Sequence, residues 1–186
     1  MYKKYTYTMA LSFLTLANVL TAKPPFNKQP ILDTNNDTNN IKIYQDLAPI
    51  AFPKNILAIE ERFKEIRKEH SLDTDFVLHP NFCAVAKKFA KYLIEAQKIS
   101  HNSKDYPFFK RVLELVGYTS NIGETIVVGY AHKEDKELAQ EVFNTLFKSP
   151  SHKEIILKKK ILYVGIGFEE KVEKWIVVII LGFKKI

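Results

Sequence analysis

Cysteine is nearly absent from this chain, since Cys83 is the single cysteine among 186 residues. This excludes a disulfide framework and any zinc site built from several cysteines. No cysteine stands directly after the apolar run near the N-terminus, which also excludes a lipid-modified N-terminal cysteine. Cys83 lies among apolar residues at helical spacing, so we predict a buried free thiol rather than a catalytic one.

Three common catalytic signatures are missing as well. The chain has no Ser-His-Asp phrase, no glycine-rich phosphate loop and no His-Glu-x-x-His helix. Basic residues exceed acidic ones by 28 to 21, for a formal net charge of +7, but the two signs are interleaved. The densest basic cluster is Lys158–Lys160, beside Lys153. Without a clustered stripe or a known binding fold we expect no nucleic-acid partner, whereas association with an acidic membrane or cell surface stays open.

Residues 1–22 have the pattern of a secretory signal peptide. Lys3 and Lys4 precede an uncharged, mostly apolar run, and Ala22 fits the last residue before cleavage. The run is short and contains Ser, Thr and Asn, so it makes a weak transmembrane span. We therefore expect an exported protein, secreted or held at the cell surface. An uncleaved membrane anchor is the alternative.

Residues 23–53 differ in composition from the rest of the chain. They contain five prolines and the polar run Asp33–Asn40. Such a segment buries too little apolar surface to offset the entropy lost on ordering. We predict a disordered tether here, followed by one folded domain over residues 54–186.

Helical patterns fill most of that domain before its period changes. Asn55 is the expected cap of the first helix, Pro80 begins a second, Pro107 a third, residues 133–147 form a fourth, and Ser151 caps a short fifth. The apolar side of the third helix is expected to be Phe108, Phe109, Val112, Leu113 and Val116.

The C-terminal part reads as two strands. Residues 161–168 and 175–183 flank a charged turn at 169–174, which predicts an antiparallel hairpin. The second strand is β-branched and apolar on both faces, which indicates a central strand with helices on both sides. The sequence therefore predicts an α+β fold with a three-layer α/β/α arrangement.

Three ionisable residues stand next to an expected turn or helix start. They are His101 in Ser100-His101, Glu124 in Gly123-Glu124-Thr125, and His152 in Ser149–Leu157. Two imidazoles and one carboxylate from separate segments are what a polar cavity or a metal site needs. They can hold Zn²⁺ with an open fourth position, or form a hydrogen-bonded cluster without metal.

The order of these phrases resembles the CAP superfamily (cysteine-rich secretory proteins, antigen 5 and pathogenesis-related-one proteins), especially its cysteine-poor bacterial SCP-like branch. The matching segments, which span most of residues 55–183, are Phe82–Lys98, Ser100-His101, Phe108–Tyr118, Gly123–Thr125, Ser149–Leu157 and Val164–Phe183. The resemblance implies an α-β-α sandwich with helices flanking an antiparallel sheet. It also implies a cavity with two histidines and two acidic residues, which binds a divalent metal in several members.

Carried over by position, the resemblance assigns His101, Glu124 and His152 as metal ligands, for Zn²⁺ or another divalent ion. The second acid falls near Ser149, where this chain has no carboxylate, and Glu141 lies about two turns earlier on the same helix. We therefore expect weak metal binding. A polar network without metal is the alternative.

Taken together, the sequence favours a secreted or surface-displayed, non-enzymatic binding module. The resemblance implies a lipid, envelope or host macromolecule as its partner. A metal-dependent hydrolase or peptidase is the alternative function, and a structural envelope protein is a third.

Overall fold

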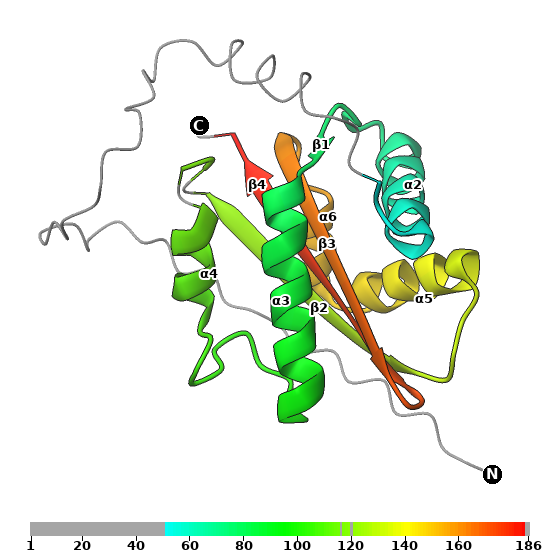
Figure 1. The fold of residues 1–186 in the computed structure, drawn as a ribbon. Coiled ribbons are helices and arrows are strands. Elements are labelled where there is room, and N and C mark those ends of the chain that lie inside the picture. Colours follow the sequence, from blue (N-terminus) through cyan, green and yellow to red (C-terminus); the bar gives the residue numbers. More distant parts are fainter. Residues whose placement is uncertain (1–50, 116, 120, 185–186) are drawn as a thin grey trace, which may run out of the picture. The chain divides into compact units, whose positions relative to one another are not determined.

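The structure is a computed structural model that describes residues 51–115, 117–119 and 121–184 (Figure 1). The expected signal peptide and nearly all of the expected tether lie outside these residues. Phe52, near the end of the expected tether, packs against the core. The helices are α2 (Lys54–Glu69), α3 (Pro80–Ala96), α4 (Phe108–Leu115), α5 (Asp135–Phe147) and α6 (Pro150–Ile156); the strands are β1 (Val77–Leu78), β2 (Ile122–Tyr130), β3 (Ile161–Lys171) and β4 (Lys174–Phe183).

One sheet has the strand order β1-β3-β4-β2. The predicted hairpin is confirmed, since β3 and β4 pair antiparallel and β4 lies between β3 and β2. Two details were wrong. The hairpin turn is only Val172 and Glu173, because pairing continues to Lys171 and Lys174. The sheet is mixed rather than antiparallel, because the short strand β1 pairs with β3 in parallel.

Helices cover both faces of the sheet, which confirms the α+β class with helices flanking the sheet. Successive side chains of β4 point to opposite faces of the sheet, so this one apolar strand contributes to two cores. Trp175, Val177 and Ile179 belong to the core formed with α2, α5 and α6. Ile176 and Val178 belong to the core formed with α3 and residues that precede β2. Figure 1 shows α3 crossing one face of the sheet, with α5 and α6 behind it.

Helix α3 lies unusually close to β3 because two strand residues lack side chains. A Cβ atom added at Gly165 would come within 2.3 Å of the Phe82 carbonyl carbon. One added at Gly167 would come within 2.2 Å of the Ala86 carbonyl carbon. Any larger residue at either position must therefore push the helix off the sheet.

The predicted apolar side of the third helix was partly wrong. Phe109 and Leu113 of α4 are 57% and 62% exposed, whereas Leu115 and Arg111 are buried. The buried face of α4 is set by Arg111, whose guanidinium lies inside the protein. Two capping predictions were also wrong, because the caps are Pro53 for α2 and Ser149 for α6, each without a side-chain cap hydrogen bond.

Cys83 is a free cysteine, as expected, but it is half-buried rather than buried. Its Sγ accepts a hydrogen bond from the Ile166 amide at 3.4 Å. Burial raises the pKa of this thiol to about 11, which keeps it in the unreactive thiol form.

A second arginine, Arg67 of α2, is also fully buried. Its guanidinium donates to the backbone oxygens of Asp73 (2.6 Å), Ile156 (3.1 Å) and Lys158 (2.9 Å). These bonds tie the end of α2 to the connection between α6 and β3. Within the described ranges, no helix is long and apolar enough to cross a membrane.

Candidate functional site

The three residues singled out in the sequence come together at one place. His101 follows α3, Glu124 lies in β2 and His152 lies in α6. His101 Nδ1 is 2.8 Å from Glu124 Oε1, and the His101 and His152 ring centroids are 6.1 Å apart. All three side chains are buried.

Glu124 belongs to a strand, β2, rather than to the expected turn. It pairs with Ile180 in the ladder between β2 and β4, and its neighbour Gly123 pairs with Leu181. A Cβ atom at Gly123 would come within 3.0 Å of the Ile155 and Phe183 side chains. The glycine therefore serves close packing of α6 and β4, and not a turn.

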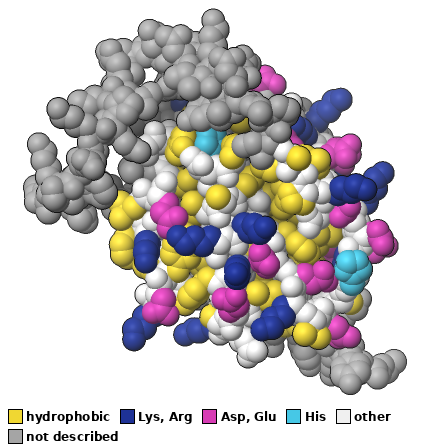
Figure 2. All heavy atoms as spheres, in the orientation of Figure 1, with side chains coloured by type: hydrophobic (Ala, Val, Ile, Leu, Met, Phe, Trp, Pro, Cys, Tyr) yellow, Lys and Arg dark blue, Asp and Glu magenta, His cyan; other side chains and the backbone are white. Residues whose placement is uncertain are grey.

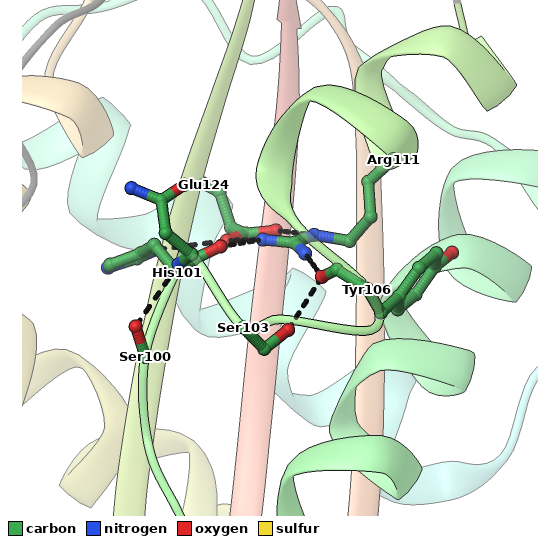
Figure 3. A network of polar contacts seen from close by, with 7 residues as sticks. Ser100, His101, Ser103, Tyr106, Arg111 and Glu124 are labelled. Carbon is green, nitrogen blue, oxygen red and sulfur yellow. Dashed lines mark hydrogen bonds and ion pairs between the residues drawn. The ribbon is translucent and has the colours of Figure 1, made fainter.

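A fourth residue, Arg111 of α4, completes the site and was missed in the sequence. Its Nε donates to Glu124 Oε2 at 2.6 Å and its Nη2 donates to Glu124 Oε1 at 2.6 Å. Figure 3 shows Arg111 and His101 meeting at the Glu124 carboxylate. The available signal was an arginine four residues before the apolar Leu115, and therefore on the same side of the helix.

Further contacts hold the guanidinium in place. Its Nη2 donates to the His101 backbone oxygen at 2.8 Å, and its Nη1 donates to the Tyr106 backbone oxygen. The Phe89 ring centroid lies 3.4 Å from the guanidinium carbon, which is a cation–π contact. Ser103 Oγ also donates to the Tyr106 oxygen, at 2.7 Å (Figure 3). The loop before α4 is therefore closed around Arg111.

His152 differs from His101 in its bonding. Within the described part of the chain, neither ring nitrogen of His152 has a hydrogen-bond partner, nor has His101 Nε2. Burial, and secondly the neighbouring His101, lower the pKa of His152 to about 4. The His152 imidazole is therefore neutral near pH 7.

His79, just before α3, is a third buried histidine. Its backbone is extended and its side chain is 1% exposed, in edge contact with Phe82. Its Nδ1 accepts the Asn81 amide at 3.2 Å and thereby caps α3. Burial lowers the pKa of His79 to about 4.

These two histidines make the protein sensitive to acid. Their folded-state pKa of about 4 lies below the unfolded value of about 6.5, so the unfolded state binds more protons between these limits. The free energy of unfolding should therefore fall as pH drops from about 6.5 to 4, by up to about 3 kcal/mol per histidine. Urea unfolding at a series of pH values measures it.

His79→Asn is the matched variant, because asparagine retains a cap acceptor but does not titrate. Carboxylates also contribute to the fall below about pH 5, and comparison with the parent removes their share. The variant should lose about half of the change measured between pH 6.5 and 5. An identical pH profile in both proteins would contradict the role of His79.

The residues as arranged do not fit the divalent metal that the resemblance implies. Both oxygens of Glu124 accept hydrogen bonds from Arg111, and Oε1 also lies 2.8 Å from His101 Nδ1, so the carboxylate is already paired with a cation. Ser149 bonds to the Ser151 hydroxyl, and Glu141 pairs with Lys133 at 2.9 Å. Across the described residues, no group of three or more His, Cys, Asp or Glu side chains has the arrangement of a metal site.

Comparison with known proteins gives matches among solved structures. No protein-family model and no curated protein matches the sequence. An outer surface protein from Borrelia burgdorferi matches with a TM-score of 0.57 and 20% identity, over 73% of this chain and 97% of that one.

Two longer proteins also match. An extracellular protein containing an SCP domain from Bacillus anthracis has a TM-score of 0.57 and 18% identity, over 74% of this chain and 45% of that chain. A cysteine-rich secretory protein from Staphylococcus aureus has a TM-score of 0.51 and 13% identity, over 72% and 40%. This chain thus spans less than half of the length of either. The chain therefore has the α-β-α fold of SCP, or CAP, domains.

Proposed function

We propose that this chain is a non-enzymatic binding domain displayed outside the cell, and that it binds an anionic lipid between α2, α5 and α6. The observation that carries this proposal is a groove of about 390 Å³. Its volume falls in the range of small-molecule sites, roughly 300–1,000 Å³. The lining residues are Arg62, Ile66, Glu69, His70, Phe143, Asn144, Phe147, Lys148 and Lys153.

The lining combines apolar and cationic groups as an anionic lipid requires. The half-buried Phe147, with the buried Ile66 and Phe143 beneath the groove, provides its apolar part. Lys148 and Lys153 are exposed at the rim, and Lys153 Nζ lies 5.3 Å from the Phe147 ring centroid. An ammonium group beside an apolar surface suits a carboxylate or phosphate head group whose chain lies on the ring.

Display outside the cell rests on two separate lines of support. The N-terminal pattern of residues 1–22 is that of an export signal. The solved proteins of the same fold are described as an outer surface protein and an extracellular protein. The charged groups on the visible described face alternate in sign, with no block of one sign on it (Figure 2). A local cationic groove therefore suits a small ligand better than a long polyanion.

The state of Glu124 favours binding over catalysis. A general base needs a carboxylate that can reach the proton it removes. Both Glu124 oxygens already accept from Arg111, and that pair is closed to solvent. The carboxylate of the central trio is therefore not available as the base of the hydrolase alternative.

Displacement of a fluorescent fatty acid by oleate tests the proposal. We expect the parent to bind the probe and Lys148→Glu/Lys153→Glu to bind it about tenfold less tightly, because two attractive charges become repulsive. Asn144→Trp, which fills the groove, should weaken binding as much.

The matched control is Lys136→Glu. Lys136 is equally exposed but lines a neighbouring groove with Ala58 and Gln140. It should leave the affinity unchanged. Absence of binding by the parent, or an equal loss in the control, would overturn the proposal.

A further inference from the structure

Helix α4 presents an apolar outer side to solvent. Phe109 is 57% exposed and Leu113 is 62% exposed, and the two lie one helical turn apart. The half-buried Phe108 and Val112 are their neighbours on the helix and extend the apolar surface inward. Single exposed apolar residues are ordinary, but adjacent large ones on the same side of a helix mark an interaction site.

Helix α3 lies beside α4 on the same side of the sheet and adds cations to this surface (Figure 1). Lys88 Nζ of α3 is 3.1 Å from Glu114 Oε1 of α4, which joins the outer sides of the two helices. Lys87 and Lys91 are exposed on the same side of α3, four residues apart. We call the exposed residues between positions 80 and 115 the α3–α4 face.

The α3–α4 face has an excess of lysine. Its exposed charged residues are six lysines and three acidic residues, whose signs interleave as on the side seen in Figure 2. Within the described ranges, Lys88 alone among the six forms an ion pair. The lysines that have no acidic partner are Lys87, Lys91, Lys98, Lys104 and Lys110.

This composition fits an anionic lipid surface better than a protein partner. Protein–protein interfaces are enriched in arginine, tyrosine and tryptophan and depleted in lysine. The α3–α4 face has no exposed arginine, tyrosine or tryptophan. The alkyl stem of a lysine covers apolar surface while its ammonium group reaches a phosphate. Apolar residues on one side of a helix with lysines around them are typical of helices that lie in a membrane interface.

We propose that the α3–α4 face docks on an anionic lipid bilayer. Phe109 and Leu113 then lie among the lipid head groups. Lys87, Lys91 and Lys110 reach the lipid phosphates. This surface is separate from the groove between α2, α5 and α6, because α3 and α4 cover the opposite face of the sheet. Docking therefore does not depend on lipid binding in that groove.

Phe109→Trp in the full chain tests docking at α4 itself. The native Trp175 is the single tryptophan and is buried, so the added indole is the exposed one. Vesicles of equal parts phosphatidylglycerol and phosphatidylcholine should shift its emission to shorter wavelength, and brominated lipid should quench it, because the ring leaves water. Leu57→Trp is the matched control, since Leu57 is 45% exposed on α2. Its emission should not change.

Charge reversal in the Phe109→Trp background measures the contribution of the lysines. Lys87→Glu/Lys91→Glu should weaken vesicle binding at least about 30-fold, because each lysine near an anionic surface contributes roughly a factor of five. Lys148→Glu/Lys153→Glu makes the same change of net charge at the groove. It should retain the vesicle affinity within about twofold, because charges on the far side of the protein are screened by salt.

The apolar contribution and the independence of the two sites are measured in the same way. Leu113→Gln in the Phe109→Trp background should weaken vesicle binding about fivefold. Displacement of the fluorescent fatty acid by oleate should be unchanged in Lys87→Glu/Lys91→Glu and in Leu113→Gln, which separates failure of docking from failure of groove binding. All of these positions are exposed, so each variant should keep the circular dichroism of the parent.

Absence of an emission shift on the anionic vesicles would overturn the proposal, and so would equal affinity for vesicles of phosphatidylcholine alone. An equal loss of vesicle affinity in Lys148→Glu/Lys153→Glu would place the contact in the groove instead. If the partner is a second copy of this chain, sedimentation velocity will show a dimer that Leu113→Gln dissociates, without vesicle binding. That result would also overturn the proposal.

Discussion

Arg111→Met is expected to lower the free energy of unfolding by about 3–5 kcal/mol in the absence of metal. The variant leaves the carboxylate of Glu124 buried without its cation, and it also removes two hydrogen bonds to backbone oxygens. Urea unfolding followed by fluorescence measures the change. Trp175 is a suitable probe, because it is the single tryptophan and only 1% exposed.

A double-mutant cycle separates the ion pair from simple loss of packing. Glu124→Gln alone should also be destabilising, because it leaves the guanidinium without its counter-charge. Arg111→Met/Glu124→Gln should cost at least about 1 kcal/mol less than the sum of the single changes, since neither charge is then left unpaired. Strict additivity of the two changes would show that the pair contributes no coupling and would contradict the role assigned to Arg111.

Gly167→Ala is expected to destabilise the protein by about 3 kcal/mol or more, at the upper end of overpacking effects. The added Cβ atom would come within 2.2 Å of the Ala86 carbonyl carbon and 2.3 Å of the Lys87 nitrogen. Both are backbone atoms of α3, so no rotamer change can relieve the clash. The helix must move, and it carries the buried side chains Phe82, Val85, Ala86, Phe89, Ala90, Leu93 and Ile94.

Gly117→Ala is the matched control for this effect. A Cβ atom at Gly117 would have no neighbour within 4 Å. Its effect on the free energy of unfolding should stay within about 0.5 kcal/mol of the parent. Equal stability of Gly167→Ala and the parent would mean that α3 does not rest directly on β3.

The sequence anticipated those elements whose apolar residues follow one period without interruption. Seven apolar residues that recur at helical spacing along α3 are all buried. The β-branched run of β4 correctly indicated a central strand with a core on each side. In these segments the residues that the local period places on one face are the residues that tertiary packing buries. The pattern alone is therefore sufficient to predict the structure.

The errors in the prediction occur where a polar residue is buried in the interior. Arg111 interrupts the buried face of α4, so counting apolar residues placed Phe109 and Leu113 inside although both are exposed. Glu124 and Thr125 made the start of β2 look like a turn, although both are fully buried in the sheet. Their partners come from other elements, and no local spacing encodes such pairing.

The trio itself was found because its three residues stand in recognisable phrases. The charge that completes it was not, because Arg111 lies 13 residues from Glu124 on a separate helix. This one residue changes the chemistry of the site, because it neutralises the Glu124 carboxylate. The sequence alone suggested that Glu124 is a metal ligand, whereas in the structure its carboxylate is paired with the permanent cation of Arg111 inside the protein.

Zinc-edge anomalous diffraction from crystals of the protein soaked in Zn²⁺ tests this central claim most directly. The expected result is bidentate contact between Arg111 and Glu124, as in Figure 3, with no anomalous peak bonded to Glu124. Surface peaks at the exposed His70 or His132 would be compatible with it. An anomalous peak bonded to both Glu124 and His152, with Arg111 displaced, would contradict it.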